Sequence, residues 1–398
     1  MTIRSARTAL AAVVFAVLLA QVLLYPGIDR LVTALGADTT LDASMWFLAA
    51  EFGAFVLFAG LWGAASDAAG RRVSFIVAGA LAGAAGYALL AGLPQVFDLP
   101  FLAILGLRTL QGAATIGAFS LSITMLMDLD GGHGRNMGAA GIAIGGGTAL
   151  GAPLGGQLYE LSPFAPLVAA SALLVVVGLL AARVTDRTPD EHRGRLAAVR
   201  ETIRETPVIL VPCAFGFVDR LTAGFFALVG TLYFREVFEL SPGATGLMLA
   251  LFFAPFAIFQ YPFGVLSDRI GRTIPVLAGS TLYGIVVIGV GLAPTVALAG
   301  AAMVAVGVIG ALMAPATMAL VTDLAADDQR GVAMAAFNAV GSLGFLAGVL
   351  VGGTVADEYG YVAAFLTVGG MEVAVATLAV PAFLKLGIPD IATRARES

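Results

Sequence analysis

The stretch GAASDAAGRR, Gly63 to Arg72, returns as GVLSDRIGR, Gly264 to Arg272, in a chain of 398 residues of which only 12% are charged. In each copy a Gly precedes an Asp by four positions, and a Gly–Arg pair follows. The shared positions of the second copy lie 201 residues after those of the first. A charged turn that recurs about half a chain length later predicts a chain built from two similar halves.

The composition indicates a protein whose main solvent is lipid. Hydrophobic residues make up 59% of the chain and the mean hydropathy is +0.96, whereas a soluble domain is about 45–50% apolar and about 25% charged. With one Cys and two distant His there is no metal cluster, and no phosphate loop or hydrolase motif is present. We therefore expect no enzyme, no cofactor and no nucleic-acid partner.

A bilayer core about 30 Å thick takes about 20 apolar residues per helix. Twelve stretches of this kind follow one another along the chain, and their lengths exclude transmembrane β-strands. The predicted spans are 8–34, 43–65, 73–92, 100–126, 137–158, 164–183, 207–233, 243–266, 274–292, 295–322, 331–353 and 361–386. The sequence predicts an all-α membrane protein with twelve transmembrane helices in two pseudo-symmetric six-helix bundles.

The placement of Lys and Arg predicts the orientation of these spans. Because the number of spans is even, both termini lie on one side. Seventeen of the 21 basic residues fall on that side, and Arg235 alone falls on the other. We therefore expect both termini in the cytoplasm and the chain in the plasma membrane.

A second pair of echoes supports the duplication. DLDGGHGR ends at Arg135 and DLAADDQR ends at Arg330, 195 positions later. The polar stretch between the sixth and seventh spans is interpreted as a solvated linker with a short amphipathic helix near its end. The predicted organisation is an N-terminal six-helix half over 1–183, a cytoplasmic linker over 184–206 and a C-terminal six-helix half over 207–398.

At these positions the chain resembles the major facilitator superfamily, a family of membrane transporters, along its whole length. The family's loop signature, roughly G-x-x-x-D-x-x-G-R-[RK], is matched by both copies of the charged turn, although the second ends on Thr273. The span-four signature, an Arg followed by Gln-Gly, resembles LRTLQGAA, with Arg108 and Gln111. GTALGAPLGG resembles the span-five antiporter signature through Gly147, Gly151, Gly155 and Gly156, with Pro153 one place later than usual.

The resemblance implies a cytoplasmic gate whose Asp pairs with an Arg of the other half. We expect Asp67 near Arg330 and Asp268 near Arg135, in pairs that break when the halves rock. The alternative is that these turns serve topology and headgroup anchoring only. The predicted gate residues are Gly63, Asp67, Gly70, Arg71, Arg72, Arg135, Gly264, Asp268, Gly271, Arg272 and Arg330.

Charged side chains inside the spans are candidates for proton coupling or substrate binding, because charge in hydrocarbon is costly. Glu51 and Asp219 are the first candidates, since a buried carboxylate can exchange a proton in each cycle. Arg108 either faces the interior or snorkels to the interface, and structural pairing with an Arg is the other alternative for the acids. The full candidate set is Asp29, Glu51, Arg108, Gln111, Asp219, Arg220 and Glu372.

The sequence thus predicts a monomeric secondary transporter of a small organic solute that works by alternating access. Proton-coupled efflux is the favoured mode, so that the substrate, H⁺ and the lipid bilayer are the expected partners. An uncoupled facilitator, an importer of a metabolite, and a non-transporting receptor or sensor of the same fold remain the alternatives.

Overall fold

The structure, a computed structural model, describes residues 3–130, 133–186, 204, 206–326 and 329–386. These residues form helices and connecting turns, and none of them lies in a strand. All twelve predicted spans are helical, and their ends differ from the predicted ones by at most six residues. Most of the predicted linker, including its amphipathic helix, lies outside the described residues.

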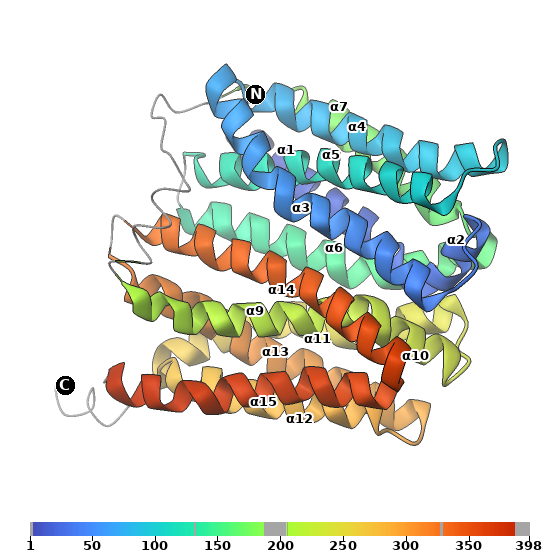
Figure 1. The fold of residues 1–398 in the computed structure, drawn as a ribbon. Coiled ribbons are helices and arrows are strands. Elements are labelled where there is room, and N and C mark those ends of the chain that lie inside the picture. Colours follow the sequence, from blue (N-terminus) through green and yellow to red (C-terminus); the bar gives the residue numbers. More distant parts are fainter. Residues whose placement is uncertain (1–2, 131–132, 187–203, 205, 327–328, 387–398) are drawn as a thin grey trace. The chain divides into compact units, whose positions relative to one another are not determined.

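The chain divides into two compact units (Figure 1). Unit 1 comprises Met1–His192 with Thr231–Ala250, and unit 2 comprises Arg193–Gly230 with Leu251–Ser398. The sequence-based division into halves at 183 and 207 stays a prediction. It differs from the two units in one respect: it assigns residues 231–250 to the second half, whereas they pack with unit 1. The helices of the first part of the chain are α1 (Ile3–Val22), α2 (Ile28–Ala34), α3 (Leu41–Ala69), α4 (Val73–Gly92), α5 (Phe101–Met127), α6 (His133–Leu161) and α7 (Ala165–Ala181).

Unit 1 is held together by helices that approach one another through small residues. α1 packs on α6, and α4 lies between α5 and α7. A Cβ atom on Gly155 of α6 would come within 2.1 Å of the Leu23 carbonyl oxygen, and one on Gly79 of α4 within 2.7 Å of the Ala114 carbonyl oxygen. Such backbone contacts supply dispersion energy, because water provides no driving force between helices in lipid.

Unit 2 contains α9, α12, α13, α14 and α15 with the later part of α11, and it packs in the same way. α9 lies along α14, and α12 lies between α13 and α15. Gly344 and Gly348 of α14 lie against the carbonyl oxygens of Phe217 and Leu221 of α9. The helices of this part of the chain are α9 (Leu210–Phe225), α10 (Thr231–Glu236), α11 (Pro242–Ile270), α12 (Thr273–Gly291), α13 (Val296–Leu324), α14 (Arg330–Tyr359) and α15 (Tyr361–Leu386).

Two of the predicted spans are interrupted rather than straight. The first is broken by a 3₁₀ turn at Tyr25–Gly27, where Pro26 removes a backbone hydrogen bond. The seventh contains a π-helical turn, Phe226–Gly230, between α9 and α10. The boundary between the two units falls directly after this turn, so that α9 and α10 belong to different units although they lie in one predicted span.

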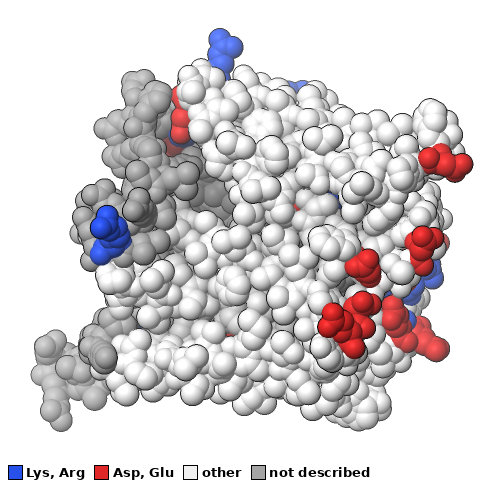
Figure 2. Space-filling model, viewed as in Figure 1, with Lys and Arg blue, Asp and Glu red and all other residues white. Residues whose placement is uncertain are grey.

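Charged side chains gather beyond the helix ends, and the helix flanks between them are almost free of charge (Figure 2). Within the part of the chain that the structure describes, ten helical segments are long and apolar enough to cross a membrane. α7 is apolar but shorter, with 17 residues, and α6 is rich in Gly. This distribution agrees with a protein whose helices stand in a bilayer.

The glycines of α14 provide a test of the packing. Gly348→Ala places a Cβ atom within 1.9 Å of the Leu221 carbonyl oxygen, and overpacking of this kind costs about 1–3 kcal/mol. We expect a lower melting temperature in detergent. Gly331→Ala is the matched control, because open space surrounds that position; equal melting temperatures for the two variants would contradict the packing described here.

Candidate functional site

Unit 1 contains a polar centre built around Arg108 of α5. Its guanidinium is fully buried, and Nη2 donates to Oε2 of Glu51 on α3 over 2.5 Å. Glu51 is also unexposed. The structure therefore excludes a snorkelling Arg108 and brings together two residues that lie 57 positions apart in the sequence.

Aromatic and amide groups complete this centre. The guanidinium carbon lies 4.6 Å from the ring centroid of Phe47 and 5.5 Å from that of Tyr87. Gln111, one turn after Arg108, accepts from Nη1 and turns its amide nitrogen toward Glu51 and Thr115. Ring faces and a carboxylate together replace the water that the guanidinium would have in solution.

Unit 2 contains a second buried glutamate, Glu372 of α15, in a different setting. Its exposed fraction is 0%. Thr222 of α9 lies 3.1 Å from Oε1, and Ser280 of α12 lies 2.7 Å from Oε2. Among the described residues no basic side chain pairs with Glu372. Two hydroxyls therefore take the place that a guanidinium has beside Glu51.

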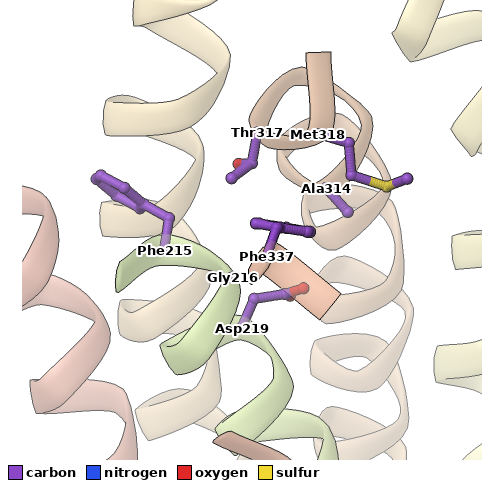
Figure 3. A pocket seen from close by; sticks show the side chains of 7 residues that line it. All are labelled: Phe215, Gly216, Asp219, Ala314, Thr317, Met318 and Phe337. Carbon is purple, nitrogen blue, oxygen red and sulfur yellow. The ribbon is translucent and has the colours of Figure 1, made fainter. Parts of the chain in front are cut away.

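Asp219 of α9 lines a cavity of about 20 Å³ within unit 2 (Figure 3). Its neighbours around this space are apolar apart from Thr317. Across the residues that the structure describes, the Asp219 carboxylate makes no hydrogen bond or ion pair. The cavity is lined by Phe215, Gly216 and Asp219 of α9, Ala314, Thr317 and Met318 of α13, and Phe337 of α14.

The adjacent Arg220 does not pair with Asp219. Its guanidinium donates to Oδ1 of Asn338 over 3.2 Å, and its side chain covers Gly341 of α14. Successive residues of a helix point about 100° apart, which is why the two neighbours face different partners. Asp219 is thus left without a partner among the described residues, beside a space large enough for a water molecule.

Asp29 of α2, the remaining acid in the candidate set, is held by an arginine that the sequence interpretation did not connect with it. Both carboxylate oxygens accept from Arg235 of α10, at 2.7–3.1 Å. The Arg235 side chain is only 11% exposed. The sequence did contain a signal for a role of Arg235, because it is the one basic residue on its predicted side of the membrane. Thr222 and Ser280 gave no such signal, because isolated hydroxyls are common in apolar helices.

The two charged turns have similar geometry in the two units. In unit 1, Arg72 contacts Asp67 at 3.3 Å and also Asp128. Asp186 accepts the backbone N–H groups of Arg72 and Val73, both at 3.1 Å, which satisfies the first donors of α4. The turn depends on Gly70, whose φ of +61° is a conformation that favours Gly.

In unit 2, Arg272 contacts Asp268 at 2.6 Å and Asp323 at 3.1 Å, and Gly271 has a φ of +87°. Burial lowers the pKa of Arg272, but hydrogen bonds to Asp268 and Asp323 outweigh it and raise that pKa above its usual value. Arg272 therefore stays charged. It aligns in sequence with Arg71, yet Arg72 occupies the corresponding place in unit 1.

The remaining gate residues lie near these turns. Gly63 and Gly264 offer their carbonyl oxygens to Ser66 and Ser267, each at 3.0 Å. Arg135 and Arg330 are exposed in the first turns of α6 and α14. The expected pairs, Asp67 with Arg330 and Asp268 with Arg135, each join the two units and stay predictions.

The Gly motif of α6 lies against α1 and the start of α11. Gly147 and Gly151 face residues of α1, Gly155 faces the Leu23 carbonyl oxygen directly after α1, and Gly156 faces the Pro242 carbonyl oxygen. Pro153 lies inside α6 and contacts Gly246. The motif therefore allows close packing of helices within unit 1.

Comparison with known proteins agrees with this architecture. The chain matches the family profile of the Major Facilitator Superfamily over residues 10–234 and 213–397. It is 31% identical over 240 residues to the tetracycline resistance protein, class G, of Vibrio anguillarum, a match that covers 58% of this chain and 59% of that protein. The matched stretch is thus less than two thirds of that relative's length.

Two solved structures show the same fold. The structure of the human organic anion transporter MFSD10 (TETRAN) aligns with a TM-score of 0.66 and 22% identity, covering 95% of this chain and 99% of that one. The nucleoside transporter NupG aligns with a TM-score of 0.74 and 14% identity, covering 96% and 99%. At these identities the structures show a shared fold. Together with the profile match over both halves, they show that the chain belongs to the Major Facilitator Superfamily.

Proposed function

We propose that this protein is a secondary active transporter that exports a small organic solute in exchange for protons. The observation that carries this proposal is the Asp219 carboxylate, which has no described partner and lines a water-sized cavity among apolar side chains. An unpaired carboxylate at membrane depth is stable only when it is protonated or meets water or a cation. Asp219 is therefore suited to take up and release a proton once per cycle.

The polar centre of unit 1 supports a fixed charge rather than an exchanging one. Glu51 accepts from Arg108 over 2.5 Å, so that the loss of its negative charge would leave a buried, uncompensated arginine. The Arg108–Glu51 pair would thus keep a fixed ion pair in the interior of unit 1, while Asp219 changes its charge. This assignment gives the two first candidates different roles.

Efflux is supported by the relative from Vibrio anguillarum, which is named a resistance protein. A transporter that confers resistance must lower the internal concentration of its compound. The Gly motif of α6, which resembles an antiporter signature, points the same way. The substrate would bind between the two halves near the midplane, and alternating access would follow from rocking of the halves.

We also propose a monomer in the plasma membrane with both termini in the cytoplasm. The excess of arginine on one side supports this orientation. Asp67 and Asp268 would then belong to a cytoplasmic gate, in which each leaves its local arginine to meet Arg330 or Arg135 of the other half. The polar linker over 184–206 would connect the halves on the same side.

Substitution of Asp219 tests the coupling. Asp219→Asn mimics the protonated acid permanently, so that an imposed pH gradient should no longer drive transport in proteoliposomes, while exchange of labelled for unlabelled substrate continues. Asp357→Asn is the matched control, because Asp357 is exposed at the end of α14. If Asp219→Asn responds to the pH gradient as the unchanged protein does, the proposed coupling is wrong; a chain with no transport in any direction would support a receptor instead.

Substitution in unit 1 tests the fixed ion pair. Glu51→Gln leaves the buried Arg108 without its counter-charge, and breaking such a pair costs about 3–5 kcal/mol. We expect a clear drop in melting temperature in detergent and loss of transport. The double variant Glu51→Gln/Arg108→Gln should recover most of the stability but not the transport. Full stability of the single variant would refute the pairing.

A further inference from the structure

Glu372 is a titratable group that the proposed coupling does not use. It lies where α9, α12 and α15 meet, and within the described part of the chain two hydroxyl groups bind it, Thr222 at Oε1 and Ser280 at Oε2. The packing beside it is close: a Cβ atom on Gly284 of α12 would come within 2.8 Å of the Glu372 Cβ. The protonation state of Glu372 depends on which of these oxygen atoms carry hydrogen.

The hydroxyl of Thr222 can donate only one hydrogen bond. Its Oγ1 lies 3.1 Å from the carbonyl oxygen of Val218, one helical turn earlier, and also 3.1 Å from Oε1 of Glu372. The Val218 carbonyl can only accept. If Glu372 were ionised, its Oε1 could also only accept, and one of the two contacts would have no hydrogen.

A proton on Glu372 resolves this shortage. Glu372 then donates from Oε1 to Thr222, and Thr222 donates to Val218, while Oε2 accepts from Ser280. Each of the three side-chain contacts, Thr222 with Val218, Thr222 with Glu372 and Ser280 with Glu372, then has one hydrogen. The charged and titratable groups that act on Glu372 across its neighbouring helices are Asp219 of α9 and Tyr283 of α12, and neither supplies a positive charge.

Glu51 shows the opposite arrangement at the same burial. Its carboxylate meets three donors: the guanidinium of Arg108, the hydroxyl of Tyr87 and the amide nitrogen of Gln111. Three donors that point toward one carboxylate favour its charged form. The two units thus surround the same side chain with different sets of hydrogen-bonding groups, three donors at Glu51 and two hydroxyls at Glu372.

We propose that Glu372 remains a neutral carboxylic acid throughout the transport cycle and links α9 to α12 and α15 by hydrogen bonds. Asp219 precedes Thr222 by three positions on α9, and the link therefore fixes the turn that carries Asp219. Glu372 is a positioning residue, and the exchanged proton is not its own. Only the consequence for Asp219 rests on the proposed function; the neutral link does not.

Infrared spectroscopy of the full chain in liposomes tests the protonation state directly. A protonated carboxylic acid has a carbonyl band distinct from that of a carboxylate. We expect one such band to persist over the whole pH range of the transport assay and to disappear in Glu372→Gln. Thr222→Val, which removes the acceptor, should shift this band without abolishing it. A Glu372 band that titrates within that range would overturn the proposal.

Transport measurements separate a positioning residue from a coupling residue. Glu372→Gln keeps one donor and one acceptor in place, and we expect pH-driven transport within about twofold of the unchanged protein, with the same pH profile. Glu372→Leu removes the link and should displace the pH profile that Asp219 determines. Loss of coupling in Glu372→Gln, as predicted for Asp219→Asn, would overturn the proposal. If Asp219→Asn leaves coupling intact, the proposed function fails while the infrared result on Glu372 stands.

Discussion

The ion pair between Arg108 and Glu51 places two unexposed charges inside unit 1, 2.5 Å apart. Neither can leave without exposing the other to a medium that cannot solvate it. The positions of α3 and α5 are therefore fixed relative to each other at this point, and Gln111, Phe47 and the rest of the polar centre are arranged around the guanidinium. Where a charge cannot be paired in this way, the protein must protonate it or surround it with water.

The two units meet this constraint differently although the chain is built from similar halves. Unit 1 contains an anion and a cation, whereas unit 2 contains a carboxylate beside a small cavity and a second glutamate between two hydroxyls. A transporter that couples to protons needs at least one group of the second kind, because a permanently paired charge has no reason to change its state.

The charged turns were predictable from the sequence, but their detailed contacts were not. The repeat identified both turns, and the positive φ of Gly70 and Gly271 explains why Gly recurs there. Alignment of the two copies equates Arg71 with Arg272. In the structure Arg72 occupies that place instead, since a side chain one residue later can reach the same Asp around the end of the helix. Which arginine forms the ion pair depends on the distance that its guanidinium can span, and a sequence motif does not specify that distance.

The sequence by itself determined the membrane class, the twelve spans, the two similar halves and the residues that carry charge in the spans. These are local properties, set by the length of apolar stretches and by the spacing of a repeat. Only the tertiary structure decided that Arg108 faces Glu51, that Asp219 has no described partner and that Glu372 lies between Thr222 and Ser280. The reason is rotational: helices rich in Gly and Ala have no strongly polar face, so their sequence does not determine which side chains point inward, and packing between backbones does.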